Sequence, residues 1–223
     1  MTSLSSLCLF FLIFASSLYS QIHVIMTSAV IPHQYEWRKM EYLTGFNAIK
    51  SYGFNPWIIE ATKVTSTFYD EISNQVLYPQ TNDLSLRNKG VNETMSMRAS
   101  LPYLPFEDDD IVIKLTGRYH LYSREFIHII EANANDYDAF VCWGKHFVTR
   151  GHVFTGCFAM RWKYFKKIIS EMNLENAERQ MIPVEYLFAE FIRQNNLKTK
   201  EIDPLHVRAR IFYSGEGVEV LDF

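Results

Sequence analysis

A short apolar run, Ile111-Val112-Ile113, leads into the polar segment Lys114-Leu115-Thr116-Gly117-Arg118-Tyr119. Such a run predicts a buried strand, and ligands of open α/β sheets bind beyond the carboxyl ends of their strands. Arg118 offers a planar, permanently charged donor fork that matches phosphate oxygens, and Lys114 offers a point charge. The segment therefore predicts a site for a multiply charged anion, and a nucleotide diphosphate is the first candidate.

The remaining residues of this segment fit the same site. Thr116 and Tyr119 carry hydroxyls that can bind a ligand, and the Tyr119 ring can also stack on one. Gly117 lets the backbone turn or approach the ligand closely. The structural alternatives are an ion pair at the strand edge for Lys114 and a salt bridge for Arg118.

A second polar segment, Asn88-Lys89-Gly90-Val91-Asn92-Glu93, precedes this strand. Gly90 lies just before a predicted helix start, where free backbone N–H groups favour an anion or a ribose. We expect Lys89 to contact a phosphate, and Asn92 and Glu93 to hydrogen-bond sugar or ribose hydroxyls. Ordinary helix capping explains the same residues, so both interpretations stay open.

The elements that must position these residues follow from hydrophobic periodicity. Ile22 to Val30 and Pro56 to Glu60 read as buried strands, and Tyr35 to Tyr52 between them reads as an amphipathic helix. This βαβ unit implies a parallel sheet. The apolar face of its helix is expected to be Trp37, Met40, Leu43, Phe46 and Ile49. Further helices are predicted at Val91–Ser100, Arg124–Ala132, Arg161–Met172 and after Pro183, and further strands at Ile111–Leu115, Asp138–Trp143 and Leu205–Tyr213. The stretch Val148–Met160 contains strand-like apolar residues around a break at Thr155-Gly156.

Composition bounds the class of protein. The chain has 223 residues, of which 48% are hydrophobic, and this is enough for one globular domain with a full core. The formal net charge of -3 argues against a general nucleic-acid binder. Any anion site must therefore be local.

Residues 1–20 read as a targeting segment. Leu7 to Ala15 is a compact apolar run that is too short to span a bilayer comfortably, and small residues follow it. We expect a signal peptide, with an uncleaved membrane anchor as the alternative because no basic residue precedes Arg38. Either implies the secretory pathway, as a secreted or ER/Golgi luminal protein with or without membrane association. In an oxidising lumen Cys142 and Cys157 either pair or remain core thiols.

The order of these pieces resembles small nucleotide-sugar glycosyltransferases of the GT-A fold. The resemblance lies in the two polar segments above, together with Phe154-Thr155-Gly156-Cys157-Phe158-Ala159-Met160 and Ile182-Pro183-Val184-Glu185. It implies a single Rossmann-like GT-A domain over residues 21–223, with a mostly parallel central sheet flanked by helices. It also implies a nucleotide-sugar donor and a glycan or other hydroxyl acceptor.

The resemblance assigns roles to two acidic residues. An acidic residue near the position of Glu60, at the end of the second strand, often contacts the nucleoside in such enzymes. An inverting transferase also needs a general base for the acceptor hydroxyl, and Glu185 in the first turn of its helix is the candidate. A surface or capping carboxylate for Glu60, and complementation of the helix dipole by Glu185, are the alternatives.

The chain departs from this family in one respect. Most members place an Asp-x-Asp pair, which holds a divalent metal, where this sequence has Lys114, Thr116 and Arg118. Asp108-Asp109-Asp110 precede the strand instead, and a five-residue strand spans about 17 Å, so we expect them at its opposite edge. Fixed cations would then stabilise the leaving diphosphate. No metal ligand is predicted and no cofactor is required, although dependence on Mn²⁺ or Mg²⁺ stays open.

Two other functions remain as alternatives. A sugar-phosphate nucleotidyltransferase shares the sheet architecture but usually has a Gly-rich, basic loop after its first strand. Here Ser28-Ala29-Val30-Ile31-Pro32 follows, with one early arginine at Arg38. The other alternative is a non-catalytic, secreted carbohydrate-binding protein.

Overall fold

The computed structural model describes residues 20–31, 35–62, 66–144, 151–212 and 218–222. Its centre is a seven-stranded sheet with the strand order β3-β2-β1-β4-β7-β6-β8. β7 pairs antiparallel with β4 and β6, and the other pairings in this sheet are parallel, which confirms the predicted mostly parallel α/β architecture. The strands are β1 (Ile22–Ser28), β2 (Trp57–Glu60), β3 (Val76–Leu77), β4 (Ile111–Thr116), β6 (Ala139–Val141), β7 (Cys157–Arg161) and β8 (Thr199–Glu201).

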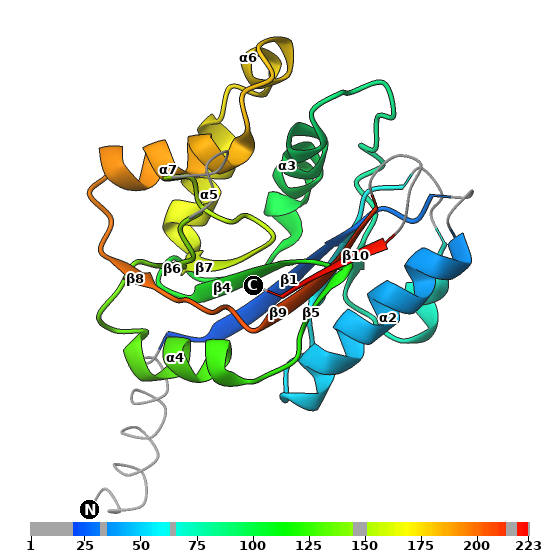
Figure 1. Ribbon diagram of the computed structural model, residues 1–223, viewed down its shortest axis with the longest axis horizontal. Coiled ribbons are helices and arrows are strands. Elements are labelled where there is room, and N and C mark those ends of the chain that lie inside the picture. The colour runs from blue at the N-terminus through cyan, green and yellow to red at the C-terminus, as the bar shows by residue number, and fades with distance from the viewer. Residues whose placement is uncertain (1–19, 32–34, 63–65, 145–150, 213–217, 223) are drawn as a thin grey trace, which may run out of the picture.

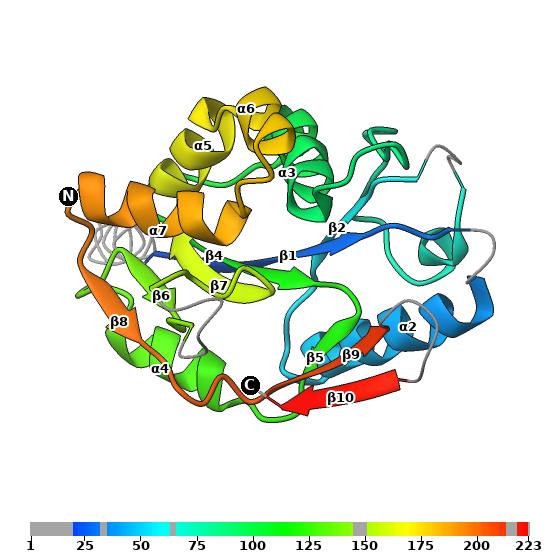
Figure 2. The same cartoon turned by 45° about the horizontal axis from the view of Figure 1, so that its top comes forward.

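Helices cover both faces of this sheet (Figure 1). One face carries α3, α5, α6 and α7, and the other carries α2 and α4, an arrangement that the turned view in Figure 2 also shows. The helices are α2 (Tyr35–Ser51), α3 (Lys89–Ser100), α4 (Glu125–Asn133), α5 (Trp162–Glu171), α6 (Leu174–Arg179) and α7 (Val184–Gln194), with short 3₁₀ turns η2 (Phe68–Glu71) and η3 (Leu101–Tyr103).

The face of α2 differs from the predicted one. Phe46 and Ile49 are buried as expected, but Met40 is 65% exposed. Trp37 and Leu43 are partly buried, and Tyr42 and Gly45 are buried in addition. A side chain at Gly45 would collide with the carbonyls of residues 117 and 119, so the backbone of the helix approaches that turn closely.

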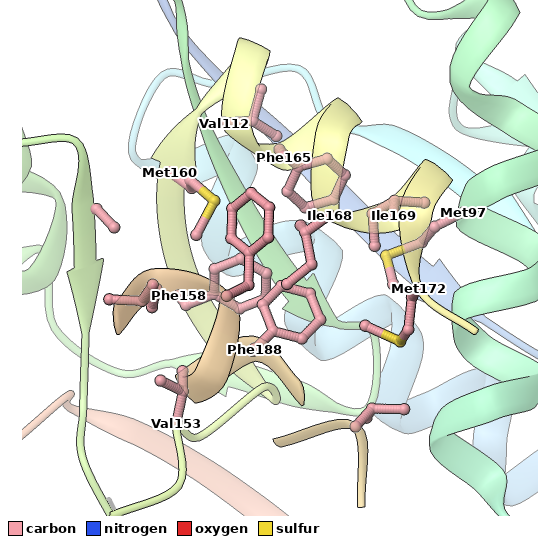
Figure 3. Packing of buried hydrophobic residues seen from close by; sticks show 14 of the residues in the cluster. Met97, Val112, Val153, Phe158, Met160, Phe165, Ile168, Ile169, Met172 and Phe188 are labelled. Carbon is pink, nitrogen blue, oxygen red and sulfur yellow. The ribbon is translucent and has the colours of Figure 1, made fainter. Parts of the chain in front are cut away.

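Aromatic packing fixes α7 on the sheet (Figure 3). The ring of Phe158 in β7 lies 5.0 Å from that of Phe188 in α7 and 6.0 Å from that of Phe165 in α5, measured between centroids. Each fully buried side chain of this size contributes about 1.5–3 kcal/mol. This core holds the first turn of α7, which carries Glu185, next to the loop that enters β7.

A second, three-stranded sheet was not expected from the sequence. It contains β5 (Tyr119–Leu121), β9 (Val207–Phe212) and β10 (Val218–Asp222) in the order β10-β9-β5. Only β9 had been predicted. β5, like β8 in the main sheet, is too short to show a clear two-residue alternation, so periodicity does not reveal it.

Two predictions concern the compartment of the protein. Residues 1–19, the greater part of the expected leader, lie outside the described residues. Within the described ranges no helix is both long and apolar enough to cross a membrane. Cys142 and Cys157 are free thiols, and burial raises the pKa of Cys157.

Candidate functional site

The carboxyl ends of three strands meet at one edge of the sheet. Thr27 in β1 pairs with Thr116 in β4, and Ser28 in β1 pairs with Glu60 in β2. β2 lies on one side of β1 and β4 on the other, so the strand order reverses between β1 and β4. This reversal is a topological switch point, the place where open α/β sheets bind ligands.

Lys114 lies beneath this edge and is shielded from solvent. Its side chain is 1% exposed, and its Nζ lies 2.8 Å from Oε1 of Glu93. It also donates 2.8 Å hydrogen bonds to the Thr116 hydroxyl and to the carbonyl of Thr155. An ammonium has three N–H donors, and all three are used. The structure therefore differs from the prediction of a direct phosphate contact by Lys114.

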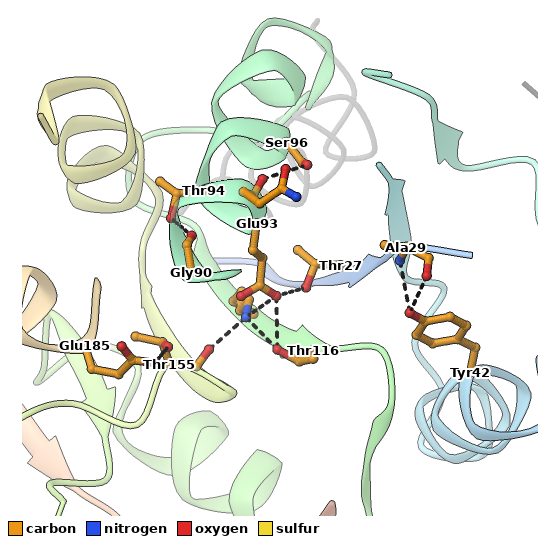
Figure 4. A network of polar contacts seen from close by, with 12 residues as sticks. Thr27, Ala29, Tyr42, Gly90, Glu93, Thr94, Ser96, Thr116, Thr155 and Glu185 are labelled. Carbon is orange, nitrogen blue, oxygen red and sulfur yellow. Dashed lines mark hydrogen bonds and ion pairs between the residues drawn. The ribbon is translucent and has the colours of Figure 1, made fainter. Parts of the chain in front are cut away.

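Glu93 in α3 is the ion-pair partner of Lys114, and Figure 4 shows its carboxylate bonded to Thr27 and Thr116. Its Oε1 accepts both of these hydrogen bonds from the threonine hydroxyls, that from Thr116 at 3.0 Å. Burial by itself would raise the pKa of Glu93, but Lys114 and the two hydroxyls outweigh it and hold the pKa below the ordinary value of 4.5. Glu93 is therefore an ionised carboxylate at the switch point.

Arg118 is half-buried in the turn after β4. Within the described part of the chain its guanidinium forms no hydrogen bond and no ion pair. It lies close enough to Tyr42 to act on that hydroxyl: burial raises the pKa of Tyr42, and Arg38 and Arg118 partly offset the rise. A half-buried cation with no carboxylate partner among the described residues suits an anionic ligand.

The neighbours of Arg118 pack against the chain itself. Gly117 donates a 2.8 Å backbone hydrogen bond to the carbonyl of Thr27, and a side chain there would collide with that carbonyl and with the Tyr42 ring. Tyr119 stacks on Phe154 with ring centroids 6.0 Å apart. The close approach predicted for Gly117 is thus made to the chain's own backbone.

Glu60 differs from the predicted nucleoside contact. It is fully buried, and its carboxylate accepts hydrogen bonds from the Ser28 hydroxyl and from the backbone N–H groups of Val30 and Thr62. Burial raises the pKa of Glu60, although these donors counteract the rise. Glu60 therefore has a structural role, because its hydrogen bonds hold the segments that follow β1 and β2.

Asn88 and Gly90 join α3 to the segment that precedes α7. Asn88 caps α3, donates a 2.8 Å hydrogen bond to the carbonyl of Ile182, and receives one from Val91 N–H. A Cβ at Gly90 would lie 2.5 Å from the side chain of Val184. These contacts match the capping alternative.

Lys89 and Asn92 also have partners within the chain. Lys89 is exposed and donates a 3.2 Å hydrogen bond to the carbonyl of Leu86. Asn92 is buried and its amide donates to Asn82 and to the carbonyl of Asp83, each at 2.9 Å. Of the described residues from 88 to 93, only Glu93 is hydrogen-bonded to Thr27 and Thr116, as Figure 4 shows.

Glu185 is connected to the same network through Thr155. The Thr155 hydroxyl donates a 3.0 Å hydrogen bond to Oε1 of Glu185, while its carbonyl accepts from Lys114. No described residue hydrogen-bonds the other carboxylate oxygen of Glu185. The half-buried Glu185 therefore has one oxygen oriented by the chain and one left to accept a proton.

The acidic triplet lies at the opposite edge, as predicted. Asp110 receives hydrogen bonds from Gln21 N–H and His23 at the start of β1. Asp108 and Asp109 pair with lysines of α5 at 2.5 Å and 2.8 Å. In the described residues no group of three or more His, Cys, Asp or Glu side chains gathers as a metal site. The end of β4 supplies an ammonium, a hydroxyl and a guanidinium, and these do not fit a divalent cation, which prefers carboxylate oxygens.

Several residues at this edge of the sheet were not recognised from the sequence as site residues. They are Thr27 and Thr155, whose hydroxyls donate to Glu93 and Glu185, and Tyr42 and Arg38, which are hydrogen-bonded to Ala29 after β1. The Thr155-Gly156 break before β7 was a visible signal, but its partners were not. A surface hollow of ≈ 670 Å³ between Trp143, Arg193 and Thr199 lies apart from this network.

Comparison with known proteins places the fold. No family model matches the chain, and no curated protein matches it in sequence. A protein from Desulfovibrio desulfuricans G20, provisionally described as a nucleotide-diphospho-sugar transferase, has a TM-score of 0.52 at 14% identity, over 82% of this chain and 80% of its own. A glycosyltransferase involved in glycosylation of the major capsid of PBCV-1 has a TM-score of 0.50 at 11% identity, over 82% of each chain.

An active-site mutant of LgtC is similar as well, with a TM-score of 0.51 at 9% identity over 80% of this chain and 72% of its own. Identities this low show the fold alone. The chain therefore has a GT-A-like α/β fold. Its cationic and carboxylate-bearing edge lies where open α/β sheets bind ligands.

Proposed function

We propose that this protein is a glycosyltransferase that moves a sugar from a nucleotide-diphosphate donor to a hydroxyl acceptor. The observation that carries the proposal is Arg118, a half-buried guanidinium with no partner among the described residues, at the carboxyl edge of a GT-A-like sheet. Oriented guanidinium donors bind phosphate oxygens in pairs and gain strength as negative charge develops.

The reaction assigns a role to each free group. The acceptor oxygen forms a bond to the anomeric carbon, and the bond from that carbon to the diphosphate breaks with its electron pair going to the diphosphate. Arg118 binds the diphosphate oxygens, and the oxygen of Glu185 that no described residue hydrogen-bonds receives the acceptor proton. Lys114, whose donors are all used within the chain, touches neither.

Replacing Arg118 tests the proposal. A panel of UDP- and GDP-sugars, with and without Mn²⁺, first identifies the donor by the rise in melting temperature that binding must produce. Arg118→Ala is then expected to lower turnover of that donor by about 100- to 1,000-fold, the usual effect of losing one oriented donor to a developing anion. Glu185→Gln is expected to lower turnover while leaving donor binding intact.

Arg179→Ala, at an exposed position of α6, is the matched control and should behave as wild type. Normal donor binding and turnover by a folded Arg118→Ala variant would refute the cationic site. Absence of any nucleotide binding would favour instead the non-catalytic carbohydrate-binding alternative.

A sugar-phosphate nucleotidyltransferase is a second candidate because of Arg38. Its guanidinium, from α2, donates a 2.9 Å hydrogen bond to the carbonyl of Ala29, directly after β1. A basic group at that place supports binding of a nucleoside triphosphate. Release of pyrophosphate from a triphosphate and a sugar 1-phosphate would favour this function over transfer from a nucleotide sugar.

We also propose that the protein works in the secretory pathway, secreted or in the ER or Golgi lumen, on the basis of its first 20 residues. N-terminal sequencing of protein expressed with a C-terminal tag distinguishes a removed signal peptide from a retained anchor. The glycans and other hydroxyl compounds of that compartment are the acceptors to test.

A further inference from the structure

Glu93 lies over the switch point of the sheet. Its Oε1 is bonded to Thr27 at the end of β1 and to Thr116 at the end of β4, the two adjacent strands between which the order reverses. We propose that the other oxygen, Oε2, binds a carbohydrate hydroxyl of the donor, and that Lys114 is the positioning residue that holds it there. This inference rests on the proposed function.

The two oxygens of Glu93 are in different situations. Oε1 receives three donors, from Thr27, Thr116 and Lys114, one more than its two lone-pair sites, so it has no room for a ligand. No described residue hydrogen-bonds Oε2, and the side chain is 25% exposed. One oxygen is therefore immobilised by the chain, and the other is left for a ligand.

The charge of Glu93 selects the kind of ligand group. An ionised carboxylate only accepts hydrogen bonds and repels phosphate, so its partner must be a donor. The hydroxyls of a ribose or of a transferred sugar are the donors that a nucleotide sugar carries. Arg118 and Glu93 thus bind different parts of the donor molecule. Arg118 binds the diphosphate, and Glu93 binds a hydroxyl.

Lys114 acts on the ligand through Glu93. It is buried below Glu93, and its remaining donors are held by Thr116 and by the carbonyl of Thr155. The other groups that face the carboxylate from β1 and β4 are the neutral hydroxyls of Thr27 and Thr116. Lys114 therefore supplies the charge that keeps Glu93 ionised and in place.

Calorimetric titration of Glu93→Gln tests the hydroxyl contact. The variant is expected to bind the nucleotide sugar about 10- to 100-fold more weakly, as for a lost hydrogen bond to a charged group. If the hydroxyl belongs to the ribose, the nucleoside diphosphate alone shows the same loss and its 2′- or 3′-deoxy analogue does not. If it belongs to the sugar, the nucleoside diphosphate binds both proteins equally. Glu175→Gln, an exposed position of α6, is the control.

If Glu93→Gln does not fold, a double variant in which neither residue 93 nor residue 114 is charged can be tested in its place. Glu93→Gln combined with Lys114→Met removes both charges and should show the same loss of affinity. Lys114→Met alone should make donor binding weaken as the pH falls from 7 to 5, because Glu93 then protonates more easily, while wild-type binding stays constant. A merely structural Lys114 would lower the melting temperature without this pH dependence.

Carboxyl NMR titration of Glu93 tests the role of Lys114 separately from the proposed function. If no nucleotide sugar binds the wild type, the proposed function fails, yet a Glu93 pKa that rises in Lys114→Met still supports the role of Lys114. An unchanged Glu93 pKa in Lys114→Met would overturn that role. If Glu93→Gln and the double variant Glu93→Gln with Lys114→Met both bind the donor with wild-type affinity, the hydroxyl contact is overturned while the proposed function stands.

Discussion

Glu60 and Glu93 lie on either side of the end of β1, at the same edge of the sheet, and their partners differ in charge. Glu60 accepts hydrogen bonds from two backbone N–H groups and one hydroxyl, all neutral, and burial raises its pKa. Glu93 accepts from an ammonium as well as from hydroxyls, and although burial alone would raise its pKa, the value is lowered. The ionised carboxylate is thus disfavoured at Glu60 and favoured at Glu93.

The oxygens show the same contrast. Both oxygens of Glu60 are bound by the chain, whereas no described residue hydrogen-bonds Oε2 of Glu93. Burial alone does not separate a structural carboxylate from one that can bind a ligand. The number of acceptor positions that the fold leaves open, and the charge beside them, make the difference.

Loss of the Glu93 charge should have the largest effect on stability. Glu93→Gln leaves Lys114 buried without its counter-charge, and we expect it to lower the free energy of unfolding by about 3–5 kcal/mol. Glu60→Gln should cost less because its partners are neutral. Urea denaturation of both variants measures the difference, and Glu93→Gln with Lys114→Met should recover most of the loss. Equal costs for the two single variants would contradict the comparison.

The pH dependence of stability should have opposite signs at the two sites. Because the pKa of Glu93 is below 4.5, its contribution is present above pH 4.5 and is lost as the pH falls through the folded-state pKa. Because the pKa of Glu60 is raised, its contribution is present below pH 4.5 and is lost as the pH rises through the folded-state pKa.

Unfolding free energies between pH 3.5 and 7 check this expectation. The gap between wild type and Glu93→Gln should shrink as the pH falls. Glu60→Gln should become more stable relative to wild type as the pH rises. Curves that run parallel to wild type for both variants would show that neither carboxyl titrates differently in the folded state.

The smallest expected effect concerns the link between the carboxylates. Thr155→Val removes the hydroxyl that donates to Glu185 but keeps the carbonyl that accepts from Lys114. We expect a loss of about 0.5–1.5 kcal/mol, the usual net value of a hydrogen bond. Thr155→Ser should be near wild type. A loss in Thr155→Val as large as that in Glu93→Gln would mean that the hydroxyl also holds the Lys114 pair.

The sequence alone predicted β1, α2, β2, β4 and the parallel sheet, because apolar runs and helix-breaking residues are local signals. It also predicted that the acidic triplet lies at the edge opposite Arg118, since strand direction and length separate the two ends of β4. Short elements such as β5 and β8 were missed because they show no clear period.

Which polar atoms meet was decided by the tertiary structure. Lys114 belongs to β4, Glu93 to α3 and Thr155 to the loop before β7, and nothing in their spacing predicts that one ammonium binds all of them. Periodicity tells which side chains turn inward, whereas hydrogen bonding depends on distances between segments that only packing brings together. For that reason the sequence could point to Arg118 as a cation at the sheet edge, but it could not show that Lys114 is already paired.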